Sequence, residues 1–156
     1  MPSIEQLFPN LADTGYTLTS SASQVYNCLA WALRDDANWW EPAGSDYWPP
    51  DLPREDTIQT VGRIFEQRGY VQCDTDAFEP GFEKVAIYGD DDGFLHAARQ
   101  LGSGRWTSKL GRLVDIEHLA LEGLAGKEYG SPRLLMRRPV PTAPTVPGSP
   151  ARSGPK

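Results

Sequence analysis

The feature that most constrains the fold is a run of three strand-like segments separated by two tight turns. The segments are residues 84–88, 94–101 and 105–110, and the turns are residues 90–93 and 102–104. The first segment, Lys-Val-Ala-Ile-Tyr, is almost wholly apolar, and both turns contain glycine. Because strands joined by such short turns pair antiparallel, this stretch predicts an antiparallel β-meander.

Helical patterns precede the meander, and one more follows it. From Val25 the apolar residues repeat at helical spacing, and this pattern ends near Asp35. A second helix is expected to have Pro53 in its first turn and to end before Gly69. The other expected elements are a helical turn at 3–8, strands at 70–73 and 134–137, and a short helix at 116–124 capped by Asp115. Helices followed by an antiparallel sheet predict an α+β fold.

The length of 156 residues suits one domain with one core, which we expect to span residues 1–138. Residues 139–156 are rich in proline, serine and glycine, so they predict a disordered tail.

Composition and charge argue against several classes of function. A net charge of -6 favours neither nucleic acid nor anionic membranes as a partner. The sequence contains no apolar run of membrane-spanning length and no basic, apolar leader at its start. We therefore expect a cytoplasmic protein with two free thiols; secretion as an effector without a signal peptide stays open.

Two side chains combine into a candidate catalytic centre. Asn27 is a suitable N-cap, which makes Cys28 the first residue of its helix. A helix N-terminus and a neighbouring imidazolium both lower the pKa of a thiol and activate it as a nucleophile. His96, on the second strand of the meander, is the histidine best placed to act with Cys28.

The cysteines and histidines can also have purely structural roles. Cys28 is in helical phase with Val25 and Leu29, a position where cysteine is commonly a small core residue. His118 is expected to be a cap or surface residue, and Cys73 a structural thiol. No metal or other cofactor is expected, because the acidic turn at 90–93 lacks the glutamate of a calcium loop and the cysteines and histidines lack zinc-site spacing.

The segments Tyr-Asn-Cys-Leu-Ala-Trp-Ala-Leu, at 26–33, and Phe-Leu-His-Ala-Ala-Arg, at 94–99, resemble the papain-like cysteine hydrolases, and especially their NlpC/P60 branch. The chain also looks like a member of a family of small bacterial proteins. In the NlpC/P60 register, Asn27-Cys28 matches the Asp-Cys pair that opens the helix. The catalytic histidine of that branch then falls at Lys84, which is a poor general base.

A second register is similar to papain itself. It makes His96 the catalytic histidine, followed by a hairpin and a strand. The segment Ser-Lys-Leu-Gly at 108–111 then stands where an Asn-Ser-Trp-Gly motif would be. In this register the resemblance implies that Ser108 orients the imidazole.

Further residues are candidates for the cleft. Gln24, Tyr26, Asn27 and Lys84 could supply an oxyanion donor or a cleft wall. Trp39, Trp40, Tyr47 and Trp48 lie in a long loop and could form the substrate wall, although we expect at least half of them to pack in the core.

Three functions follow from these residues. The first is a cysteine hydrolase that cleaves a peptide, amide or isopeptide bond of a peptide or protein substrate through Cys28, His96 and Ser108. The second is a catalytically inactive papain-like fold that binds a peptide or protein through its aromatic loop. The third is an acyltransferase with the same nucleophile, which the sequence does not separate from the first.

Overall fold

The structure, a computed structural model, describes residues 3–140, so most of the predicted tail lies outside the described residues. The helices are α1 (Ile4–Leu7), α2 (Leu11–Thr14), α3 (Cys28–Ala32), α4 (Ile58–Glu66) and the 3₁₀ turn η1 (Leu121–Leu124). The strands are β1 (Tyr16–Ser20), β2 (Val71–Cys73), β3 (Phe82–Asp90), β4 (Gly93–Gln100), β5 (Trp106–Lys109), β6 (Asp115–His118) and β7 (Ser131–Pro139).

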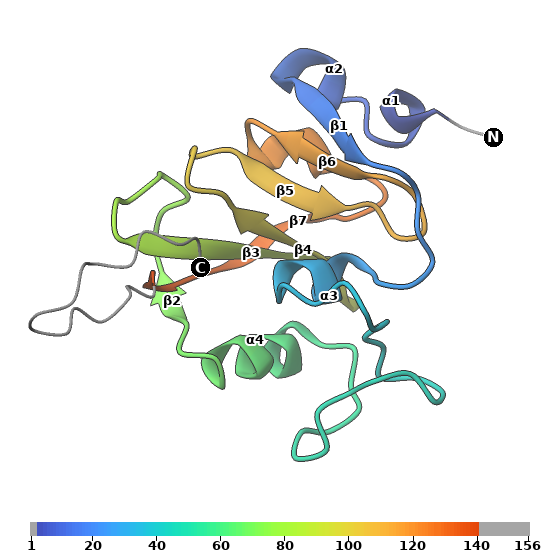
Figure 1. Cartoon of the computed structure of the whole chain (residues 1–156), viewed down its shortest axis with the longest axis vertical. Helices are drawn as coiled ribbons and strands as arrows, with labels where there is room; N and C mark the ends of the chain where they lie inside the picture. Colours follow the sequence, from blue (N-terminus) through green and yellow to red (C-terminus); the bar gives the residue numbers. More distant parts are fainter. Residues whose placement is uncertain (1–2, 141–156) are drawn as a thin grey trace, which may run out of the picture.

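One antiparallel sheet organises the described residues. Its seven strands run in the order β1-β6-β5-β4-β3-β7-β2. The predicted meander is confirmed as β3, β4 and β5, which are neighbours in the sheet. Figure 1 shows the first helices, α1 and α2, near β1, and α3 and α4 on the other side of the strands. The α+β class is therefore confirmed.

Strand β3, in the interior of the sheet, is buried on both faces, and its successive side chains point alternately into two cores. Val85 and Ile87 belong to a core that α3, α4 and the aromatic loop cover. Ala86 and Tyr88 belong to a second core with residues of α2, β5, β6 and η1. Because paired residues share a face, His96, which pairs with Tyr88, faces the second core.

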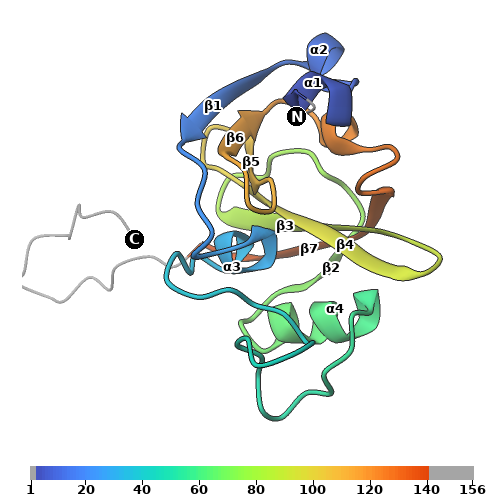
Figure 2. The same ribbon diagram turned by 90° about the vertical axis from the view of Figure 1, so that its right-hand side faces the viewer.

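The candidate site lies near strands β4 and β5, whose hydrogen-bonded ladder is short. It comprises two residue pairs, Arg99 with Thr107 and Gln100 with Trp106. On its other side β4 pairs with β3 from Gly93 to Arg99. Helix α3 packs against both β4 and β5, and Figure 2 shows it lying across these strands.

Several predicted elements are wrong. The predicted helix at 116–124 is instead strand β6 followed by η1, because residues 115–118 pair with both β5 and β1. Edge strand β1, at residues 16–20, is not among the elements expected from the sequence. Helix α4 starts after its N-cap Thr57, whose side chain accepts from the Thr60 amide, rather than at Pro53.

Candidate functional site

Helix α3 is short, and Asn27 fixes where it starts. The Asn27 Oδ1 atom accepts from the Ala30 amide at 3.2 Å, as the sequence predicts for an N-cap. The same side chain accepts from the Trp40 amide at 3.3 Å and donates to the Trp40 carbonyl at 2.7 Å. Asn27 therefore ties the start of α3 to the aromatic loop.

Cys28 is the first residue of α3 and is 9% exposed. Burial raises the pKa of its thiol to about 11, although the backbone amides of Ala97 and Leu29 act in the opposite direction. The expectation of a depressed thiol pKa is therefore wrong: at this site desolvation outweighs the helix N-terminus. The resting residue is a neutral thiol next to the amide that follows His96 in β4.

A chain of three buried side chains lies behind His96. The His96 Nε2 atom is 3.0 Å from Ser108 Oγ, which is 2.8 Å from His118 Nε2. The other ring nitrogen of His118, Nδ1, is 3.1 Å from the carbonyl oxygen of Ala120. All three side chains are fully buried and come from adjacent strands β4, β5 and β6.

The proton positions along this series of hydrogen bonds follow from the Ala120 carbonyl at one end of it. A carbonyl oxygen only accepts, so His118 carries its proton on Nδ1. Burial lowers the pKa of His118 to about 4, so the ring is neutral and its Nε2 accepts from Ser108. Because a hydroxyl has one proton, His96 Nε2 must then donate to Ser108 Oγ.

This assignment leaves the other nitrogen of His96 as a free base. Burial, and then His118, hold the pKa of His96 well below its usual range, so its Nδ1 carries a lone pair and no proton. Among the described residues, His96 Nδ1 has no hydrogen-bond partner. Burying an acceptor atom without a hydrogen-bond partner costs free energy. Such unpartnered buried atoms call for an explanation, and a catalytic role is one of them.

Tyr129 packs against His96 and also lines the cavity at Cys28, whereas His96 itself does not line that cavity. The Tyr129 ring stacks on the imidazole of His96, with centroids 4.1 Å apart and planes 7° apart. Tyr129 and Cys28 also line the same cavity. Tyr88 also packs against the imidazole, with the two rings tilted by 65°, so the ring plane is held by packing as well as by hydrogen bonds.

The cavity at Cys28 has a volume of about 260 Å³. Three of the four predicted wall aromatics line it, Trp39, Trp40 and Trp48, together with Asn27, Leu29, Glu41, Pro42, Asp56, Phe94, Leu95, Gly111 and Tyr129. Its charged side chains are both acidic. Burial raises the pKa of Glu41 and that of Asp56, and repulsion from the carboxylates of Asp56 and Asp46 raises the pKa of Glu41 further.

The remaining cleft candidates lie elsewhere. Tyr47 packs edge-on against Trp40 but is 45% exposed and does not line the cavity. Gln24 is exposed and does not line it either. The Tyr26 hydroxyl donates to Asp115 at 2.8 Å, and its ring stacks on Trp31. None of Tyr47, Gln24 and Tyr26 lines the cavity at Cys28.

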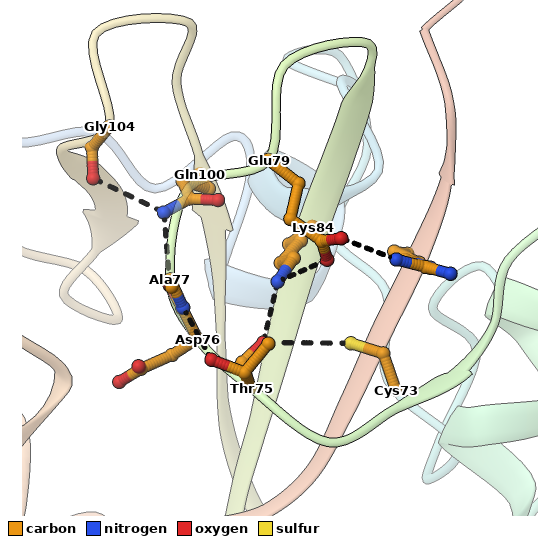
Figure 3. Close-up of polar contacts among 9 residues, drawn as sticks. Cys73, Thr75, Asp76, Ala77, Glu79, Lys84, Gln100 and Gly104 are labelled. Atoms are coloured by element: carbon orange, nitrogen blue, oxygen red, sulfur yellow. Dashed lines mark hydrogen bonds and ion pairs between the residues drawn. The ribbon is translucent and has the colours of Figure 1, made fainter.

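Lys84 is also absent from the cavity, which corrects its assignment to the cleft. Its Nζ atom donates to the Thr75 carbonyl at 2.6 Å and forms an ion pair with Glu79 at 2.8 Å. Figure 3 shows this cluster, in which the Cys73 thiol donates a hydrogen bond to the same Thr75 carbonyl at 3.7 Å. Arg137 holds the other oxygen of Glu79 at 2.6 Å. Lys84 is thus a buried structural cation.

Sequence reasoning missed His118, Tyr129 and the acidic pair of the cavity. His118 was expected to be a cap or surface residue, yet it is fully buried against Ser108. A signal was present, because a strand reading of residues 115–118 places Ile116 and His118 on one face. No comparable pattern marks Tyr129, which lies in the turn before β7.

The described residues contain no group of three or more histidine, cysteine or acidic side chains arranged to hold a metal ion. Over the same residues, no helix is long and apolar enough to cross a membrane. A family model described as a domain of unknown function, DUF7689, matches residues 17–137. This range includes every residue of the cavity and of the histidine chain. No curated protein and no solved structure matches the sequence.

Proposed function

The chain belongs to the DUF7689 family, and we propose that it is a cysteine hydrolase that cleaves a peptide, amide or isopeptide bond. Cys28 is the nucleophile and His96 is the general base in this proposal. The observation that carries it is the hydrogen-bond chain through Ser108 and His118, which leaves His96 Nδ1 unprotonated and unpartnered. We further propose that the fold is papain-like, in the register that assigns the imidazole-orienting role to Ser108.

The proposed reaction starts from a neutral thiol and a neutral imidazole. His96 Nδ1 takes the proton of Cys28 as the sulfur attacks the acyl carbon. The amides of Cys28 and Leu29, at the start of α3, are suited to stabilise the developing oxyanion. The imidazolium then gives its proton to the leaving amine, which leaves a thioester on Cys28.

Hydrolysis of the thioester reverses the roles. His96 Nδ1 takes a proton from water, the hydroxide oxygen attacks the thioester carbon, and the proton returns to the Cys28 sulfur as the acid leaves. Throughout, the Nε2 proton of His96 stays directed at Ser108, so the imidazolium is stabilised on its far side.

Acetylation by p-nitrophenyl acetate tests the proposal without knowledge of the substrate. We expect an acetyl group on Cys28, found by mass spectrometry of digested protein, to form faster than on half-buried Cys73. His96→Gln should remove this advantage, and Cys73→Ser should leave it intact. Equal acetylation of the two thiols, or an unchanged rate in His96→Gln, would overturn the assignment.

The fate of the acetyl group separates hydrolase from transferase. Release of p-nitrophenol beyond one equivalent in water alone supports the hydrolase. Release that requires an added amine, with the amide as product, supports the acyltransferase.

A non-catalytic binding module is the second candidate, and the raised pKa of the Cys28 thiol favours it. Its cavity would hold a peptide side chain against Trp39, Trp40 and Trp48. In that case Cys28→Ala would keep peptide binding and the cellular phenotype, whereas Trp39→Ala would lose both. Loss of the phenotype in a folded Cys28→Ala protein would exclude this candidate.

A further inference from the structure

A second cavity, which we call the arginine cavity, lies near the C-terminal end of α3. Its volume is about 300 Å³, and its lining shares no residue with the Cys28 cavity. Charged and apolar side chains contribute to it, including Arg34, Arg99, Glu83, Phe78, Phe82 and Leu101.

Arg99 is largely buried and lines this cavity without a carboxylate of the described residues paired directly to its guanidinium. The residue is 7% exposed, and its guanidinium stacks over the ring of Trp31. Among residues 3–140 the guanidinium makes one hydrogen bond, from Nε to the Trp31 carbonyl at 3.4 Å, and no ion pair. Because a guanidinium has five N–H donors, both terminal nitrogens of Arg99 lack a partner in this part of the chain.

The neighbouring charges increase this imbalance. Glu83 accepts from Arg34 at 2.7 Å and from Arg138 at 2.5 Å, so its carboxylate is already shared by two cations. Burial, and then the charge of Arg34, lower the pKa of Arg99 to about 10. Positive charge therefore exceeds negative charge at this cavity, although the whole chain has a net charge of -6.

The backbone of Arg34, the other arginine of this cavity, has an unusual conformation. Arg34 has a φ of 65°, and among the described residues it is the one non-glycine with a positive φ. It follows Leu33, the C-cap of α3, at a position where glycine is strongly preferred. The side chain of Arg34 lines the cavity and pairs with Glu83.

We propose that the arginine cavity binds an oxyanion, either the carboxylate or the phosphate of a small ligand. The terminal nitrogens of Arg99 would donate two parallel hydrogen bonds to it, and Arg34 would supply a second charge. The apolar part of the ligand would contact Phe78 and Phe82. This site is independent of the acyl chemistry at Cys28.

Isothermal titration at fixed ionic strength tests the site with two probes, inorganic phosphate and sodium benzoate, and chloride as background. Wild-type protein should bind at least one probe at one site per chain. Arg99→Met should weaken that binding at least tenfold. Arg63→Met removes an exposed arginine from α4, so it controls for loss of charge and should bind like wild type. The tighter probe identifies the ligand class.

Two results would overturn the site: no binding of either probe to wild type, or equal binding by Arg99→Met. If Arg99→Met does not fold, Arg99→Lys keeps the charge and loses the paired donors, and the same tenfold loss is expected. The acetylation rate of Cys28 should be equal in wild type and in the Arg99 variants. Failure of the anion site is thus distinguishable from failure of the proposed hydrolase.

Discussion

At the scale of single residues, the candidate site depends on which nitrogen of each histidine carries a proton. His118 does not contact the cavity, yet it determines the proton position on His96 through Ser108. It is therefore a positioning residue in the proposed reaction. A group that fixes the tautomer and orientation of a reactive imidazole contributes to its activity without touching the substrate.

Replacing His118 tests this role. His118→Phe removes the acceptor for the Ser108 hydroxyl, so we expect acetylation of Cys28 to slow by about tenfold or more. His118→Gln offers a carbonyl acceptor in its place and should recover part of the rate. Circular dichroism of each variant checks that the fold is kept. An equal loss in both folded variants would show that His118 acts by packing alone.

The pH dependence of acetylation is a second test at this scale. The pKa of His96 is well below its usual range because the ring is buried, so its Nδ1 stays unprotonated at mildly acidic pH. We therefore expect the acidic limb of the pH–rate profile for Cys28 acetylation to have its midpoint below pH 6.5, the usual pKa of histidine. His118→Phe should move this limb upward, because His118 also lowers the pKa of His96. A wild-type limb at or above pH 6.5 would contradict the neutral, buried base.

At the scale of elements, α3 owes its position to Asn27 as much as to its own few residues. The Asn27 side chain caps the helix and also holds the Trp40 backbone from both sides. Asn27→Ala should lower the free energy of unfolding by about 2 kcal/mol in urea titrations and slow acetylation of Cys28. Thr57→Ala removes the cap of α4 and should cost about 1 kcal/mol without changing the rate. Equal acetylation rates in both variants would show that the Asn27 cap does not affect the reactivity of Cys28.

The turn that presents Tyr129 offers a second test of an element. Gly130 has a φ of 68°, and a Cβ there would lie 2.2 Å from the carbonyl oxygen of Gly89. Gly130→Ala should therefore destabilise the protein by about 3 kcal/mol or more, measured by urea unfolding. At Gly69, with a φ of 91°, a Cβ would meet nothing within 4 Å. Gly69→Ala should cost about 1 kcal/mol, and a similar loss at both positions would exclude the clash.

Local signals in the sequence were enough for the meander and the start of α3. Tight turns specify antiparallel neighbours, and Asn27 acts within three residues of its own position. Strand β6 was missed because Asp115 looks like a cap, while its pairing with β1 and β5 is set by distant residues. The contact of Tyr129 with His96 likewise arises from tertiary packing, which no local periodicity encodes.

At the scale of the whole molecule, the two cavities differ in charge. The Cys28 cavity is lined by Glu41 and Asp56, whereas the arginine cavity has an excess of guanidinium groups. Helix α3 joins them, because Cys28 begins the helix and Arg34 follows its end. A molecule with this arrangement presents opposite charges within the length of one short helix.

The buried histidines should also govern how the whole fold responds to acid. Burial lowers the pKa of both His96 and His118 in the folded state, and that of His118 reaches about 4. In the unfolded chain the histidine pKa values are near 6.5, so between the folded and unfolded pKa values the unfolded chain binds more protons than the folded protein. The stability that depends on these histidines is therefore complete above pH 7 and is lost as the pH falls. Between pH 7.5 and 5 we expect the two residues to cost about 4 kcal/mol, measured by urea unfolding. His118→Gln should remove about half of this dependence. A wild-type stability that stays constant down to pH 5 would mean that these histidines are not held neutral by the fold.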